Sequence, residues 1–178
     1  MVEDAAILVT GLLSWTLLEY LIHGWLSHLC TTAVSARHAV HHRDPHAVFV
    51  VRAWRPLAVI WIAGLAAFGW SPGMIFFAGL TLGFAAYEVL HYRMHFCRPR
   101  GSLETWMRAR HLIHHRREPQ RCLGVTTPFW DLVFGTEPIS EMDQLIASVA
   151  ASAPLTGPTN LWRLFTLPYF GSSRLTPR

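Results

Sequence analysis

The hydrophobic residues of this chain gather in long apolar runs that short polar segments separate. Three runs carry almost no charge, and they cover residues 5–22, 53–70 and 74–90. Only Glu19, Arg55 and Glu88 interrupt them. As helices of 17 or 18 residues, each would rise about 26 Å, close to the ~30 Å hydrocarbon core of a bilayer. Because almost no polar face remains to meet water, buried helices of a soluble protein are the less favoured alternative. The pattern predicts an all-α, polytopic membrane helical bundle of about three spans.

The polar segments predict how the bundle is oriented. Ser71-Pro72-Gly73 separates the second and third runs, and Pro followed by Gly suits a type II turn, so these runs are expected to form a tight helical hairpin. Arginine is concentrated after the first run and after the third, in residues 37–55 and 93–121. Since Arg-rich short loops stay in the cytoplasm, both segments are expected there, and the hairpin tip outside.

Composition strengthens the membrane interpretation. Of the 178 residues, 52% are hydrophobic and only 15% are charged, against ~25% charged in an ordinary soluble domain. The net charge of +4 accompanies long apolar runs, so a membrane surface is a better partner than nucleic acid, and no nucleic acid is expected. The three cysteines show no paired spacing that would predict a disulfide framework. The chain has no Lys and a single Asn, which favours a GC-rich bacterial source and an inner membrane.

Histidine supplies the candidate chemistry. Ten of the eleven histidines form four groups, HGWLSH, HAVHH, HYRMH and HLIHH, whose members are His23, His28, His38, His41, His42, His91, His95, His111, His114 and His115. Residues three and four apart share one helix face, so a group can direct several imidazoles at one spot. His23 and His28 are five apart, about 140° around an ideal helix, and need a helix end or local unwinding to converge. His46 lies outside the groups and is expected to be a loop residue.

All four groups fall on the Arg-rich side of the predicted spans, where they form a cytoplasmic histidine-rich cap. One metal takes four to six ligands, so ten imidazoles predict two metal ions. An all-nitrogen ligand set suits Fe, Zn, Cu or Ni better than Mg or Ca. A single HxxHH pattern arises by chance, whereas four such groups in order on one side do not.

Two acidic residues precede histidine groups within the apolar runs. Glu19 is four residues before His23, and Glu88 is three before His91. Each is placed to accept the second ring N–H of a ligand histidine and so to fix its tautomer. The alternative is a carboxylate that reaches the interface or pairs with Arg.

At these residues the chain resembles the membrane fatty acid hydroxylase and sterol desaturase superfamily, whose pattern is HX3–4H, HX2–3HH, a helical hairpin, HX3H and HX2HH. The order of the groups is most similar to that of fatty acid 2-hydroxylases, and HHRDP at residues 41–45 is similar to their HHxxP. Residues 124–136 resemble the superfamily's segment after the last group, so the resemblance covers roughly residues 19–137. The related beta-carotene hydroxylases have wider spacing in the third group and rank second.

The resemblance implies a membrane-embedded di-iron oxygenase, with zinc possible in the isolated protein. It would use O2 and two external electrons to hydroxylate or desaturate a lipid C–H bond, on a fatty acyl or related substrate. The chain has no GxGxxG motif after a strand, so a separate donor of the cytochrome b5, ferredoxin or reductase type is expected. The Arg-rich face either docks such a donor or reflects membrane orientation alone. A metal transporter or storage protein and a family member with only structural zinc are the competing classes.

Two regions are expected. Residues 1–137 would form the histidine-box membrane hydroxylase domain, and residues 138–178 a C-terminal tail. Within the tail, residues 161–165 either lie on the membrane interface or cover the site. A short helix is expected before the tail, with Thr127 as its cap, Pro128 in its first turn and Gly135 at its end. Its aromatic face is expected to close one wall of the site. Asp131, in that helix, is expected to be a structural cap or a partner of Arg rather than a ligand.

Overall fold

The computed structural model describes residues 1–47, 51–139 and 142–151, and in this part every ordered element is a helix. The elements are α1 (Val2–Leu21), the π-helical turn η1 (Ile22–Leu26), α2 (Ala33–Arg43), the 3₁₀ turn η2 (Pro45–Ala47), α3 (Val51–Phe68), α4 (Pro72–Phe96), α5 (Ser102–Arg116), α6 (Phe129–Phe134) and α7 (Met142–Ala151). The predicted all-α class is confirmed.

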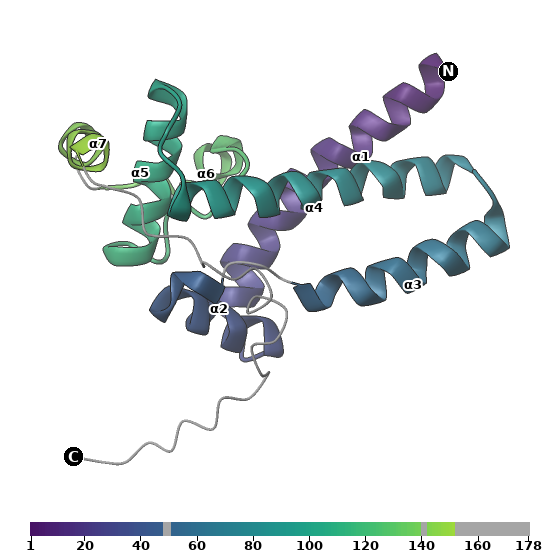
Figure 1. The fold of residues 1–178 in the computed structure, drawn as a ribbon, viewed down its shortest axis with the longest axis horizontal. Coiled ribbons are helices and arrows are strands. Elements are labelled where there is room, and N and C mark those ends of the chain that lie inside the picture. Colours follow the sequence, from purple (N-terminus) through teal and green to yellow (C-terminus); the bar gives the residue numbers. More distant parts are fainter. Residues whose placement is uncertain (48–50, 140–141, 152–178) are drawn as a thin grey trace, which may run out of the picture.

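All three apolar runs form helices. Two stretches of 25 residues, Val2–Leu26 and Pro72–Phe96, are long and apolar enough to cross a membrane, while the apolar helix Ala53–Phe68 is shorter. The N-terminus and the tip of the α3–α4 hairpin lie at one end of the molecule (Figure 1). Helices α2, α5 and α6 gather toward the other end, where α1 and α4 finish (Figure 1). The polar, Arg-rich segments therefore lie together, as the charge pattern predicts.

Helices α1 and α4 cross at a seam of glycines. A Cβ atom at Gly79 would overlap the carbonyl oxygen of Leu8, and one at Gly11 would overlap that of Phe76. Beside this crossing, a Cβ at Gly83 would lie 2.5 Å from Cβ of Trp15. Small residues let membrane helices approach until their backbones touch. The crossing therefore fixes the histidines at the end of α4 relative to those at the end of α1.

The hairpin turn lies earlier than predicted. Gly69 follows α3 in the left-handed conformation, with φ of +58°, as is common for the residue that ends a helix. Ser71 is the N-cap of α4, and Pro72 is its first residue. The predicted type II turn at residues 71–73 is wrong because Pro is especially well suited to the first helical position, where its missing N–H costs nothing.

Directly after α1 lies a local unwinding, one of the two arrangements that the His23–His28 spacing predicts. Residues Ile22–Leu26 form a π-helical turn, and the Ser27 N–H bonds the carbonyl of Ile22, five residues earlier. A π turn closes i to i+5, so residues five apart lie on the same side. His23 and His28 can therefore face one point, which a regular α-helix would not allow.

The short helix α6 packs against α1. The Trp130 indole donates to Thr16 Oγ1 at 2.9 Å, and the ring of Phe134 stacks on Tyr20 with centroids 5.2 Å apart. Gly135 ends the helix with φ of +70°, as expected. The aromatic side chains thus contact α1, and the loop before α6 lies at the histidines instead. Helix α7, inside the predicted tail, packs against α5, and residues 161–165 lie outside the described residues.

Candidate metal centre

The ten grouped histidines converge at the polar end of the bundle and divide into two sets of five. We name them cluster one (His23, His28, His38, His42 and His114) and cluster two (His41, His91, His95, His111 and His115). Within each cluster, one ring nitrogen per residue lies within 4.8 Å of all the others. His46 lies outside both, and its Nδ1 is 2.9 Å from Asp44 Oδ1.

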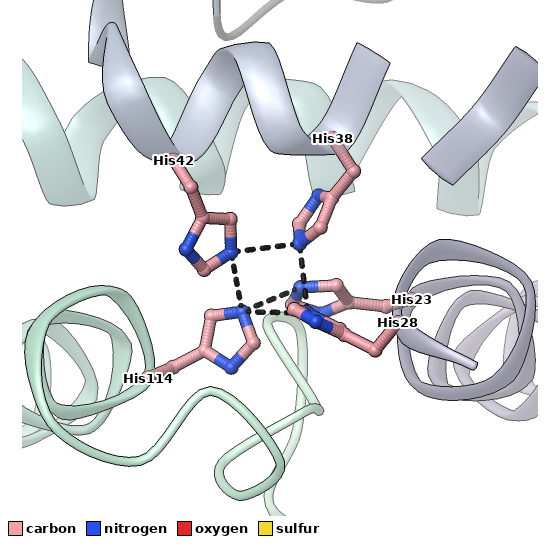
Figure 2. Close-up of side chains that lie close together, drawn as sticks. All are labelled: His23, His28, His38, His42 and His114. Carbon is pink, nitrogen blue, oxygen red and sulfur yellow. Dashed lines mark hydrogen bonds between the residues drawn. The ribbon is translucent and has the colours of Figure 1, made fainter. Parts of the chain in front are cut away.

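Cluster one draws its side chains from three directions. Figure 2 shows His38 and His42 projecting from α2 and His114 from α5. His23 projects from η1, and His28 from the residues just after it. The Nε2 atom of His114 lies 3.0 Å from Nε2 of His23, 3.3 Å from that of His28 and 3.0 Å from that of His42. His38 Nε2 lies 2.9 Å from His28 Nε2 and 2.8 Å from His42 Nε2. Five nitrogens thus face one centre.

Cluster two lies deeper and joins α2, α4 and α5. Nε2 of His111 is 2.8 Å from Nε2 of His95, and the His41 ring centroid lies 4.5 Å from that of His91 and 4.7 Å from that of His115. Within the described residues, both ring nitrogens of His41 and of His91 are buried without a hydrogen-bond partner. Buried polar atoms are rarely left unsatisfied, so this set calls for a bound cation.

The two clusters are adjacent. The ring of His42, in cluster one, stacks on that of His115, in cluster two, with centroids 4.3 Å apart and planes 17° from parallel. The expectation that each group converges on a single spot is wrong for HAVHH and HLIHH. Consecutive helical residues point about 100° apart, so His41 and His42, and likewise His114 and His115, enter different clusters.

The environment keeps the imidazoles neutral. Burial, and then the neighbouring His42, lower the pKa of His28 to about 4. Burial, followed by the charges that His95, His42 and His23 would carry, lowers the pKa of His41 to about 2. The pKa of His111 falls far below its usual range for the same two reasons. A neutral imidazole offers a free lone pair, which is the form that binds a metal.

The loop between α5 and α6 orients two rings of cluster one. Nδ1 of His23 lies 2.5 Å from the carbonyl oxygen of Leu123, and Nδ1 of His114 lies 3.0 Å from that of Arg121. A carbonyl only accepts, so Nδ1 carries the proton in both rings and the Nε2 lone pairs face the cluster centre. Sequence reasoning did not identify these carbonyls, because backbone acceptors have no residue-type signature.

Neither acidic residue contacts its expected histidine. Glu19, only 3% exposed, accepts from the Val125 N–H at 2.6 Å and from the Thr126 hydroxyl. Glu88 is also buried, but no described residue lies within hydrogen-bond reach of either His91 ring nitrogen. The predicted contact between Glu19 and His23 is therefore wrong, whereas a contact of Glu88 with another ligand histidine stays a prediction. Glu19 instead holds the loop whose Leu123 carbonyl orients His23.

Asp131 holds the same loop from its other side. Its fully buried carboxylate accepts from the Leu123 N–H at 2.8 Å, the Gly124 N–H at 3.0 Å and the Thr136 hydroxyl at 2.7 Å. It also pairs with the guanidinium of Arg110 at 2.9 Å. The expectation that Asp131 is a structural residue paired with Arg is confirmed.

Comparison with known proteins agrees with this arrangement. The model of the family described as fatty acid hydroxylase matches residues 8–136. The chain belongs to the fatty acid hydroxylase family. The family match contains both histidine clusters and the loop that orients them, and the resemblance inferred from the sequence is confirmed.

Curated relatives within this family are 2-hydroxylases and related enzymes. A dihydroceramide fatty acyl 2-hydroxylase of Arabidopsis thaliana is 31% identical over 150 residues, covering 74% of this chain and 60% of the relative. A ceramide very long chain fatty acid hydroxylase of Schizosaccharomyces pombe is 32% identical, covering 72% and 41%. A fatty acid 2-hydroxylase of Mus musculus is 33% identical, covering 72% and 38%. The chain thus spans at most 60% of the length of these relatives. No solved structure matches it.

The histidines of this fatty acid hydroxylase family member fit a pair of transition-metal ions. Nitrogens bound at ~2.1 Å lie about 3.0 Å from their neighbours in an octahedral shell and about 3.4 Å apart in a tetrahedral one, and five neighbouring nitrogen pairs of cluster one are 2.8 to 3.3 Å apart. Neutral rings, all-nitrogen donors and unpartnered buried nitrogens in cluster two point the same way.

Proposed function

We propose that this chain is a membrane-bound, di-iron lipid hydroxylase that acts on carbon 2 of fatty acyl chains. The observation that carries the proposal is the pair of adjacent five-histidine clusters at one end of two membrane-length helices. Family membership and the 2-hydroxylases among the relatives support the reaction type. A transporter is disfavoured, since its ligands belong near the middle of the membrane, between broken helices.

In this proposal the ten histidines hold two iron ions, five to each cluster. When bound, the irons supply the redox chemistry with O2 that breaks an unactivated C–H bond, which no acid or base can do alone. Overall, the lipid C–H bond, O2, two electrons and two protons give the hydroxylated lipid and one water. The protein orients the donor nitrogens through the carbonyls of Leu123 and Arg121. It also shields cluster two, since His91, His95 and His111 are each at most 3% exposed.

The basic charge at the polar end of the bundle suggests both how electrons are supplied and how the protein is oriented in the membrane. We expect an external donor of the cytochrome b5, ferredoxin or reductase type to approach the clusters from the polar end. Exposed arginines at that end include Arg43, Arg116 and Arg117, and basic surfaces attract acidic partners. Such donors are cytoplasmic, so the clusters are assigned to the cytoplasmic side, with a bacterial inner membrane as the proposed location. The lipid would enter sideways from the bilayer.

Lipid analysis of host cells tests the proposal. Cells carrying the wild-type chain, His115→Ala or His46→Ala would be extracted, and their fatty acids analysed by mass spectrometry. We expect 2-hydroxy fatty acids with wild type and with the His46→Ala control, which lies outside both clusters. His115→Ala should abolish them. Equal product from both variants contradicts the metal role, and hydroxylation at another carbon contradicts the assigned position.

A further inference from the structure

A buried arginine beside cluster two is not used by the metal centre. Arg108, on α5, is 4% exposed. Within the described residues its Nη1 donates to the Cys97 carbonyl at a long 3.4 Å, and its Nε is buried with no hydrogen-bond partner. A guanidinium carries five N–H donors and stays charged. Leaving such a donor unsatisfied is costly, so this site is built to receive an acceptor.

Arg108 opens into a small cavity between the end of α4 and the start of α5. Its volume is about 20 Å³, whereas a single water needs roughly 10–15 Å³, so one oxygen atom of a ligand fits. Apolar side chains of Leu90, Met94 and Met107 line it together with the two arginines Arg93 and Arg108. Glu104 also lines it, so the cavity combines two arginines and one carboxylate with an apolar wall.

The other charged groups of this cavity already satisfy one another. Arg93 Nη2 donates to both carboxylate oxygens of Glu104, at 2.9 and 2.8 Å. The Arg100 N–H adds a third bond to the same carboxylate, at 2.8 Å. Glu104 is thus held by three hydrogen bonds to its own partners, none of them from Arg108, and Arg108 keeps donor capacity for a ligand.

We propose that Arg108 binds the oxyanion at the head of an acyl lipid, a carboxylate or a phosphate, with the acyl chain leaving along Leu90 and Met94. Arginine is suited to both groups because its planar fork donates two parallel bonds. Arg108 precedes His111 by three residues and His115 by seven, so it lies on the same face of α5 as cluster two. This inference rests on the proposed function in one respect: a carboxylate held there keeps carbon 2, one bond away, beside the clusters.

Binding measurements on the purified, metal-loaded chain in detergent test the oxyanion site. The probes are palmitate, a palmitoyl lysophosphatidate and uncharged palmitamide, at a pH where the carboxylate is ionised. We expect wild type to bind at least one oxyanion about tenfold or more tightly than palmitamide. Arg108→Gln should remove that preference while leaving palmitamide affinity within about twofold. The matched control Arg98→Gln, at an exposed position between α4 and α5, should behave as wild type.

Each outcome of these binding measurements either supports or contradicts the oxyanion site. Preference for palmitate identifies the substrate carboxylate, and preference for the lysophosphatidate identifies a phospholipid head group. If wild type shows no preference, or if Arg108→Gln weakens all three probes equally, the site does not exist. Arg108→Lys, which keeps the charge, should retain part of the preference even where the Gln variant folds poorly. Lipid hydroxylation is scored separately, so oxyanion binding without 2-hydroxy product contradicts the proposed function and leaves the site standing.

Discussion

His114 and His115 are neighbours in the chain, yet their rings enter different clusters, with centroids 5.7 Å apart and planes at 85°. His41 and His42 on α2 divide in the same way. Both clusters therefore depend on the same two helices, α2 and α5, although each has five ligands of its own. A change in one ring should affect one cluster, whereas a change in the supporting backbone should affect both.

The first prediction concerns metal content. Protein purified without chelators should contain close to two metal ions per chain, one for each cluster. In cluster one, the Nε2 atom of His38 lies 2.8 Å from that of His42. His38→Ala removes this ligand and should reduce the metal content toward one ion per chain. Elemental analysis of the folded protein measures this. His46→Ala is the control and should retain both ions. A metal content near zero in the wild-type protein would contradict the two-metal assignment.

The loop anchored by Asp131 should be essential to the stability of cluster one. Asp131→Asn leaves the buried guanidinium of Arg110 with Glu137 as its remaining charged partner, so the loss should fall below the ~3–5 kcal/mol of a fully broken buried pair. It also weakens the hydrogen bond from the Leu123 N–H to residue 131. The carbonyl of the same Leu123 is the acceptor for His23 Nδ1. We expect a lower melting temperature and loss of about one metal ion.

Glu104→Gln is the matched control for Asp131→Asn. Its ion pair with Arg93 is partly exposed, at 33% and 19% for the two side chains, and such pairs contribute at most ~1 kcal/mol. Melting curves of both variants in the same detergent provide the comparison. Equal losses in the two variants would show that Asp131 has no special role in the loop.

The glycine crossing should tolerate no added side chain. Gly79→Ala places a Cβ against the Leu8 carbonyl and separates α1 from α4, at a cost of ~1–3 kcal/mol from overpacking. Because α4 carries His91 and His95, metal content should fall as well. Gly73→Ala is the control, since its Cβ would meet only Ser71 Oγ at 3.9 Å. A Gly79→Ala variant as stable and as metal-rich as wild type contradicts the role of the crossing.

Membrane orientation can be measured with single cysteines. In a chain lacking Cys30, Cys97 and Cys122, an impermeant thiol reagent applied to intact cells should label Gly73→Cys at the hairpin tip and spare Ser102→Cys at the start of α5. The Arg-rich segments predict this orientation. The reverse pattern would place the clusters away from a cytoplasmic electron donor. Labelling at neither position would show that the α3–α4 hairpin does not cross the membrane.

Several features of this protein follow from local sequence alone. The apolar runs predict the helices because an apolar stretch of membrane length has few other stable conformations. The spacing of the histidines indicates a nitrogen-rich, two-metal centre, since residue type determines ligand chemistry. The five-residue interval between His23 and His28 predicts a helix end or a local unwinding, and the structure has the unwound turn at Ile22–Leu26. Each of these signals lies within a few consecutive residues.

Only the tertiary structure decided how these parts combine. Assignment of each histidine to a cluster depends on how α2, α4 and α5 are rotated against one another, which no short segment encodes. The acceptor for His23 is the Leu123 carbonyl, 100 residues away in the chain, and the two carboxylates that hold this loop, Glu19 and Asp131, reach it from separate helices. Backbone carbonyls look alike in every sequence, so packing alone makes one of them an orienting partner. The same is true of Arg108. The sequence does not distinguish it from the other arginines, and only its burial leaves Nε without a hydrogen-bond partner among the described residues.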